Sequence, residues 1–230
     1  MILLAIENCA AADAAEPLAD SRQCLVVVTD SWNSTAGVIS TFQRGRNSRW
    51  MKRSTFPVVI GKAGLAWGRG LIDTKNLPGP RKREGDDKAP AGIFRLTDVF
   101  GWEKKTKMPF LKVTPHLICV DDPKSRYYNR VFNELDTVPW DWRHAERLSV
   151  VGSYRMGVIV EQNMPPERGH GSCIFLHIWK SPTTPTSGCT AMAQETLIDL
   201  IHWLDPAAVP VLIQLPRSIY GQFRAVWNLP

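Results

Sequence analysis

Residues 173–192 read CIFLHIWKSPTTPTSGCTAM, and this stretch contains three different kinds of sequence. Residues 173–179 form a short apolar run, which predicts a buried strand. Residues 180–188 are rich in Ser, Thr, Pro and Gly, which predicts a loop. Cys189 then begins a segment in which apolar residues recur with helical spacing. The stretch therefore predicts a strand with His177 near its end, a loop, and a helix with Cys189 at its entrance.

His177 and Cys189 are predicted to act together as a base and a nucleophile. Side chains alternate along a strand, so His177 shares a face with Phe175. A thiol at a helix N-terminus faces the positive end of the helix dipole, which lowers its pKa from about 8.5 into the range of roughly 3.5–7.5. Gly188 lets the backbone approach closely, and the N–H groups near it are expected to bind an oxyanion. Cys189, His177 and Gly188 are therefore the candidate catalytic residues.

Two segments resemble the L,D-transpeptidase catalytic domain (YkuD domain) family. His177 followed by Thr186-Ser187-Gly188-Cys189 is similar to the family signature of a His and then [Ser/Thr]-x-Gly-Cys. Residues 84–94, EGDDKAPAGIF, resemble the family's Gly-Asp…Pro-x-Gly-x-Phe segment. Both segments occur in the expected order, and the resemblance extends over residues 24–216. It implies a thiol enzyme that is acylated by peptidoglycan stem peptides.

The resemblance implies a reaction with Cys189 as nucleophile. Cys189 would attack an amide carbonyl, while His177 takes the thiol proton and later returns one to the leaving amine. An amine would then resolve the thioester in a transpeptidase, and water would do so in an L,D-carboxypeptidase or an amidase. A non-catalytic wall-binding module on the same fold is a further alternative. The family also implies the cell envelope or periplasm as location and requires no cofactor.

Four further residues are expected to contact the substrate. Ser187 and Thr186 stand directly before the Gly-Cys pair. Tyr128 and Asn129 end an acidic turn that is similar to a segment of distant family members. All four are candidate substrate-binding residues.

The composition predicts a globular chain with a basic balance. The protein has 230 residues, 44% hydrophobic and 22% charged, with a net charge of +6. Such a charge suits an anionic wall polymer, and it also suits nucleic acid. Aromatic residues do not interleave with the basic ones as they do in nucleic-acid modules. We therefore expect no nucleic-acid partner.

The five cysteines, at positions 9, 24, 119, 173 and 189, leave at least one thiol unpaired. A zinc site could be drawn from four residues of the types that bind zinc, namely His170, Cys173, His177 and Cys189. Their spacing is not that of a zinc finger or ribbon. We therefore expect no metal.

Residues 1–22 are expected to be an incomplete export signal or a disordered leader, because an apolar start leads into small residues without a basic region. No run of about 20 apolar residues occurs, so no membrane span is expected. Residues 23–230 are expected to form a single catalytic domain.

Many short strand patterns with Gly and Pro turns predict a mostly β fold, a mixed and largely antiparallel sheet or sandwich. Residues 24–30 and 38–44 are expected to open it as a hairpin, with residues 51–60 as the third strand. Residues 193–205 carry the one long helical pattern. Residues 209–215 are expected to close the sheet at an edge because of Pro210. A turn is expected at Pro90 and Gly92.

Overall fold

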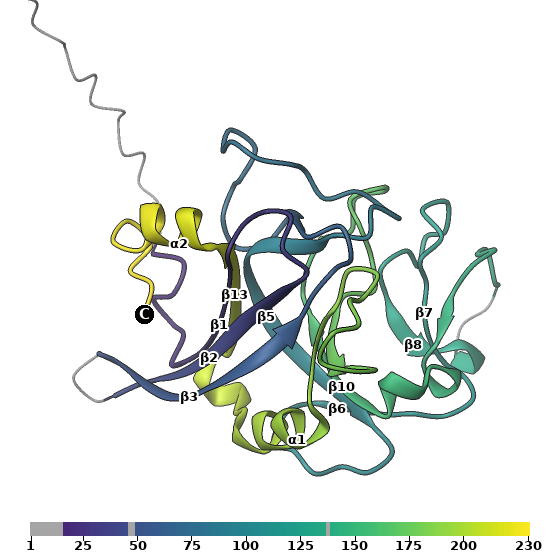
Figure 1. The fold of residues 1–230 in the computed structure, drawn as a ribbon. Coiled ribbons are helices and arrows are strands. Elements are labelled where there is room, and N and C mark those ends of the chain that lie inside the picture. Colours follow the sequence, from purple (N-terminus) through teal and green to yellow (C-terminus); the bar gives the residue numbers. More distant parts are fainter. Residues whose placement is uncertain (1–15, 46–48, 137–138) are drawn as a thin grey trace, which may run out of the picture.

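The computed structural model describes residues 16–45, 49–136 and 139–230 (Figure 1). Ten strands form one mixed sheet in which most pairs are antiparallel, as the sequence predicts. The order is β10 (Met156–Val160), β11 (Phe175–Ile178), β12 (Thr190–Met192), β3 (Trp50–Val59), β2 (Ala36–Arg44), β1 (Gln23–Thr29), β13 (Val211–Pro216), β5 (Ala89–Gly101) and β4 (Leu65–Trp67), with β6 (Phe110–Lys112) beside β5.

The sheet closes on itself through β10. This strand pairs with β11 on one side and with the second half of β5 on the other. Strand β5 can serve several neighbours because it is 13 residues long: its first part pairs with β4 and β13, and its last part with β10 and β6. Closure leaves few unpaired strand edges.

The predicted opening hairpin and third strand are confirmed. Strands β1 and β2 pair from Gln23 opposite Gln43 to Val28 opposite Val38, and β2 pairs in turn with β3. Strand β1 is an almost continuous apolar run because both of its faces are buried. It lies near the centre of the sheet, between β2 and β13.

Two predictions based on proline were wrong. Strand β13 is not at an edge, since it lies between β1 and β5. Pro210 precedes the strand, so its missing N–H removes no bond from the ladder, and its carbonyl accepts from Leu96 N at 3.0 Å. Pro90 and Gly92 form no turn but lie within β5. Gly92 has φ +143°, and a Cβ there would lie 2.9 Å from the Phe94 ring, which requires glycine.

The main core lies inside the closed sheet and beneath α1 (Gln194–Trp203). The predicted helix is confirmed, with Leu197, Leu200 and Ile201 buried. A second helix, α2 (Arg217–Phe223), packs against β1 and β13. Four short 3₁₀ turns complete the helical structure of the described residues: Glu134–Asp136, Leu148–Val150, Gly152–Tyr154 and Pro206–Ala208. No helix in the described ranges is both long and apolar enough to cross a membrane.

A second, three-stranded sheet forms a small lobe beside the main sheet, on the right of Figure 1. Its order is β8 (Val131–Asn133), β7 (Leu117–Cys119) and β9 (Glu146–Arg147). Glu146 and Arg147 of β9 both pair with β7. A disulfide from Cys119 to Cys173 joins this lobe to the segment that leads into β11.

The expected leader falls partly outside the described residues, which begin at Glu16. From there the chain packs onto the domain. Leu18 is completely buried in the main core, and its carbonyl accepts from Arg44 Nη1 at 3.1 Å. Residues 16–22 therefore belong structurally with the sheet.

Candidate active site

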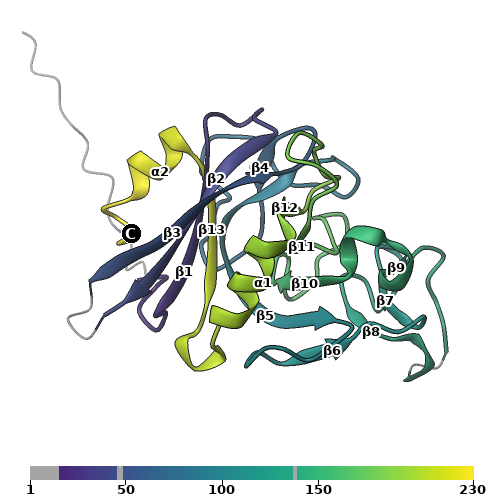
Figure 2. The same ribbon diagram turned by 60° about the horizontal axis from the view of Figure 1, so that its bottom comes forward.

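Cys189 and His177 line one cavity of about 600 Å³. The cavity lies where the main sheet meets the small lobe: β11 and the loop 180–188 form one wall, and residues of the lobe and of the segment 82–87 form the others. Strands β11 and β12 lie side by side and in parallel, with His177 paired to Ala191, two residues beyond Cys189 (Figure 2). Parallel pairing thus returns the chain after the loop to the strand that carries His177.

Cys189 is not at a helix entrance, and this correction changes the electrostatics of the thiol. The residue precedes strand β12, and α1 begins five residues later at Gln194. The loop 180–188 leads back into the sheet because Ala191 pairs with both β11 and β3. The positive end of a helix dipole therefore does not act on the thiol, since the effect is confined to the first turn of a helix.

The thiol is buried and held by backbone groups of the neighbouring strand. Cys189 is 6% exposed. Its Sγ accepts from Phe175 N at 3.3 Å and donates to Cys173 O at 3.5 Å. Burial raises the pKa of Cys189 to about 12, and the negative charge of Glu146 adds to this, while the Phe175 N–H and the Tyr154 hydroxyl act in the opposite direction. The thiol is therefore neutral at pH 7, contrary to the lowered pKa expected from the sequence.

His177 is held in one tautomer. Its Nδ1 lies 2.8 Å from Ile178 O, a carbonyl that can only accept, so Nδ1 carries the proton and Nε2 keeps a lone pair. Burial lowers the pKa of His177 to about 4, partly offset by that hydrogen bond. The imidazole is therefore neutral at pH 7 with one nitrogen able to accept a proton, which is the form a general base requires.

Tyr154 lies against both residues. Its ring packs edge-on to His177 with centroids 5.0 Å apart, and it belongs to the same buried cluster as Cys189. Within the described chain, His177 and Cys189 form no hydrogen bond with each other. The cavity thus holds a neutral thiol and a neutral imidazole that share Tyr154 as a neighbour.

A family model for the L,D-transpeptidase catalytic domain, YkuD, matches residues 33–213. The chain belongs to this family. The match includes both segments that carry the resemblance in the sequence, and the mostly β fold agrees with it.

Comparison with solved structures finds the helical cell shape determining protein Pgp2 from Campylobacter jejuni, with 12% identity and a TM-score of 0.38. The alignment covers 84% of this chain and 48% of that protein, so the chain spans about half of its length. No curated protein sequence matches the chain.

The signature loop of this L,D-transpeptidase-type domain is fixed mainly by Thr186. The Thr186 hydroxyl donates to Cys189 O at 2.6 Å and accepts from Gly188 N at 3.1 Å, and its backbone N–H donates to Ile60 O at 2.9 Å. The Gly188 N–H is therefore engaged within the loop. Gly188 itself has φ +147°, a conformation that favours glycine. Ser187 is exposed and lines the cavity.

Tyr128 and Asn129 are placed differently from the other predicted site residues. Tyr128 is 2% exposed and donates to Glu84, a carboxylate at the cavity. Asn129 lines a separate cavity on the other side of Cys173, and its Oδ1 accepts from Cys173 N at 3.0 Å. Both side chains thus contact protein groups that support the site.

In this domain the acidic segment 84–87 mainly shapes the wall of the cavity. Lys82 is 5% exposed and pairs with Asp86, whose carboxylate also accepts from Arg83 N at 2.7 Å and Lys88 N at 3.0 Å. Glu84 accepts from Ser172 Oγ at 2.8 Å. These contacts close the turn against the segment before β11.

Sequence reasoning missed Glu146 and Tyr154. The Tyr154 hydroxyl donates to Glu146 Oε2 at 3.1 Å, and both residues line the cavity. Burial raises the pKa of Glu146 to about 7, and the charges of Asp121 and Glu84 add to this. No local pattern marks either residue, because they come from a two-residue strand and a 3₁₀ turn that only the tertiary fold brings to Cys189.

The zinc alternative does not fit the site. Cys173 is bonded to Cys119, so it has no thiolate to offer a metal. His170 lies 3.6 Å from Glu167 Oε2. Among the described residues, no group of three or more His, Cys, Asp or Glu side chains is arranged to hold a metal ion.

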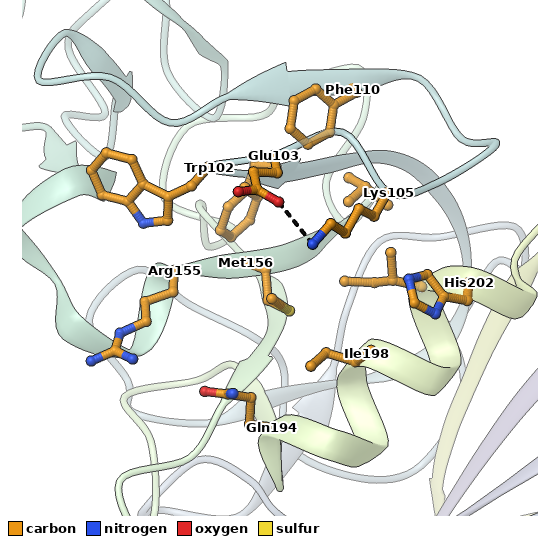
Figure 3. A pocket seen from close by; sticks show the side chains of 13 residues that line it. Trp102, Glu103, Lys105, Phe110, Arg155, Met156, Gln194, Ile198 and His202 are labelled. Atoms are coloured by element: carbon orange, nitrogen blue, oxygen red, sulfur yellow. Dashed lines mark ion pairs between the residues drawn. The ribbon is translucent and has the colours of Figure 1, made fainter.

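Another pocket, of about 340 Å³, lies between residues 99–110 and helix α1 (Figure 3). Trp102 and Phe110 face Ile198 and His202 of α1 across it, and an ion pair of 2.8 Å joins Glu103 and Lys105. Phe100 lines this pocket and packs edge-on to Phe175, whose backbone N–H donates to the Cys189 sulfur. No cysteine or serine occurs among the described residues that line this pocket.

Proposed function

We propose that this chain is a cysteine acyltransferase of the L,D-transpeptidase type that acts on peptidoglycan stem peptides. The observation that carries the proposal is the shared cavity of Cys189 and His177, in which the Ile178 carbonyl leaves His177 Nε2 available as a base. Family membership supports the substrate class. The net charge of +6 also suits attraction to an anionic wall polymer.

In the proposed reaction, His177 removes the thiol proton as Cys189 Sγ attacks the amide carbonyl. A thiol with a raised pKa does not ionise beforehand at neutral pH, so proton transfer accompanies attack. Because the Gly188 N–H is engaged by Thr186, the Cys189 N–H is the proposed oxyanion donor. The exposed Ser187 is proposed to contact the substrate at the mouth of the cavity.

An amine that resolves the thioester makes the protein a transpeptidase, and water makes it an L,D-carboxypeptidase or amidase. The cell envelope or periplasm is the proposed location. The Cys119–Cys173 disulfide supports this, because disulfides persist in oxidising compartments.

The test is incubation of the purified protein with defined muropeptides, followed by mass spectrometry of protein and products. We expect an acyl adduct on Cys189 and cross-linked or trimmed peptides, and neither with Cys189→Ala. An alanine variant with wild-type turnover would overturn the proposal. A protein that binds muropeptides without forming an adduct or product would support the wall-binding module instead.

A further inference from the structure

Acyl transfer from an amide needs a proton donor for the leaving amine as well as a base for the thiol. We propose that Glu146, acting through the Tyr154 hydroxyl, supplies this proton, while His177 serves the thiol. The inference rests on the proposed function and deepens it. It replaces the expectation that His177 performs both proton transfers.

One hydrogen bond connects Glu146 to Tyr154, which packs in the same buried cluster as the reacting cysteine. Tyr154 Oη lies 3.1 Å from Glu146 Oε2, and Tyr154 and Cys189 line the same cavity. In the tetrahedral intermediate the leaving nitrogen is bonded to the same carbon as Sγ, so it lies within about 3 Å of the sulfur. The Tyr154 hydroxyl, which lines the same cavity as the sulfur, is thereby placed on the side of the leaving nitrogen.

Tyr154 is held in this position by packing on several sides. Its ring is edge-on to Phe175 at 5.4 Å, to His177 at 5.0 Å and to Phe100 at 6.1 Å. Burial raises the pKa of the Tyr154 hydroxyl, with the charges of Cys189 and Glu146 acting in the same direction. The hydroxyl therefore stays protonated, which suits a group that passes a proton on rather than storing one.

Burial and the charges around Glu146 favour its protonated form, while the hydrogen bond that it accepts from Tyr154 acts in the opposite direction. Asp121 and Glu84 face it from neighbouring segments of the cavity wall, and both raise its pKa. Lys82 acts on Cys189 and is paired with Asp86. Arg147, the next residue in the chain, forms an ion pair with Glu134, so its positive charge is paired with that carboxylate and not with Glu146. A carboxyl group surrounded in this way holds a proton near neutral pH and can donate it.

The pKa values of His177 and Glu146 are therefore shifted in opposite directions. Burial lowers the pKa of His177 to about 4 and raises that of Glu146 to about 7. At a pH between these values His177 is free of its second proton and Glu146 retains its own. Two titratable groups whose pKa values are pushed apart in this way allow one site to supply a base and an acid at the same pH.

Each proton in the proposed step has a stated source and destination. As Cys189 Sγ bonds to the acyl carbon, His177 Nε2 takes the thiol proton. When the C–N bond breaks, the nitrogen takes the hydroxyl proton of Tyr154, which takes the carboxyl proton of Glu146. In deacylation the incoming amine or water gives its proton through Tyr154 back to Glu146, and His177 returns a proton to the departing thiolate.

The experiment compares two donors that carry the same acyl group, an amide and a p-nitrophenyl ester. The ester's leaving group departs as an anion and needs no proton donor. We expect Tyr154→Phe and Glu146→Gln to slow single-turnover acylation by the amide about 10²–10⁴-fold and leave acylation by the ester within about threefold of wild type. His177→Gln should slow both. The formation of acyl-Cys189 is followed by intact-protein mass spectrometry.

Matched controls are Tyr220→Phe, a tyrosine that bonds to Pro230 O far from the cavity, and Glu103→Gln at the rim of the other pocket. Circular dichroism identifies any variant that fails to fold, and Tyr154→Phe, which removes one oxygen, keeps the test open if Glu146→Gln does not fold. Amide acylation by wild type should also fall as the pH rises past about 7, and Glu146→Gln should lack this fall.

The outcomes separate this proposal from the proposed function. Equal slowing of ester and amide, or normal amide rates in both variants, would overturn the relay while leaving acylation of Cys189 in place. A wild-type protein that is acylated by neither donor would overturn the proposed function. Acylation by the ester alone would overturn amide chemistry and the relay together.

Discussion

The disulfide between Cys119 and Cys173 connects the small lobe to the segment that leads into β11, the strand that carries His177. Cys119 on β7 pairs with Glu146 on β9. The carbonyl of Cys173 accepts from the Cys189 sulfur at 3.5 Å. One covalent bridge therefore helps to hold Glu146, the proposed proton donor, near Cys189, the proposed nucleophile, although the two residues come from different sheets.

The first prediction concerns this bridge. The variant C119S/C173S should lose about 4 kcal/mol of unfolding free energy, because the disulfide closes a loop with a sequence separation of 54 and constrains the unfolded chain. Urea unfolding measures this loss. Reductant should lower the stability of wild type to that of the variant and leave the variant unchanged. Equal stability of oxidised and fully reduced wild type would contradict the prediction.

The second prediction concerns thiol reactivity. Limited iodoacetamide treatment followed by peptide mapping should label Cys189 before Cys24, because Cys189 lines the cavity and Cys24 is completely buried. Cys119 and Cys173 should remain unlabelled without reductant. Burial raises the pKa of Cys189 to about 12, so its labelling should be slow at pH 7 and accelerate steadily at higher pH. A rate that levels off by pH 7 would instead indicate the low-pKa thiolate expected from the sequence.

Local patterns predicted much of this fold. The β-branched run of β1, its hairpin partner and the apolar stripe of α1 were all recognisable, because each depends on the alternation or helical spacing of nearby residues. The role of Pro210 could not be recognised in this way. The sequence does not show whether the hydrogen-bonded strand begins before or after a proline. The bonding of Thr186 and the tautomer of His177 likewise depend on backbone groups that the fold supplies.

The candidate site was predicted in part for the same reason. Cys189, His177 and Ser187 lie in one signature stretch and meet at one cavity. The helix dipole assigned to Cys189 was wrong because the short strand β12 lies between the cysteine and α1. Glu146 and Tyr154 carry no signature, and only the tertiary fold brings them to the cavity that contains the thiol. Their relevance became visible only with the tertiary structure.

The third prediction concerns stability and pH. The pKa of His177 is lowered from 6.5 to about 4, so its neutral form stabilises the fold by up to about 3 kcal/mol above pH 6.5, and this is lost as the pH falls towards 4. The pKa of Glu146 is raised from 4.5 to about 7, so its contribution, of similar size, is present below pH 4.5 and lost as the pH rises towards 7. The two opposing effects should leave wild-type stability nearly flat across this range.

Replacing one of the two residues at a time should reveal the pH dependence of stability that the other one causes. With Glu146→Gln, only the His177 effect remains and stability should rise between pH 4 and 6.5; with His177→Gln, it should fall between pH 4.5 and 7. Urea unfolding at several pH values measures both, with Glu103→Gln as the control. Parallel profiles for wild type and both variants would contradict the prediction.

The last prediction tests His177 as the base. Only the neutral imidazole accepts a proton, so the acylation rate should rise with pH through the His177 pKa of about 4 and be insensitive to that group above it. His177→Gln should lack this rise and acylate about 10²–10⁴-fold more slowly. A purely structural His177 would lower the melting temperature and leave the shape of the profile unchanged, so both quantities are measured on the same variant. A stable His177→Gln protein with a wild-type profile and rate would rule out the base, and the thiol proton would then have to leave by another route, for which Tyr154 is the neighbouring candidate in the same buried cluster.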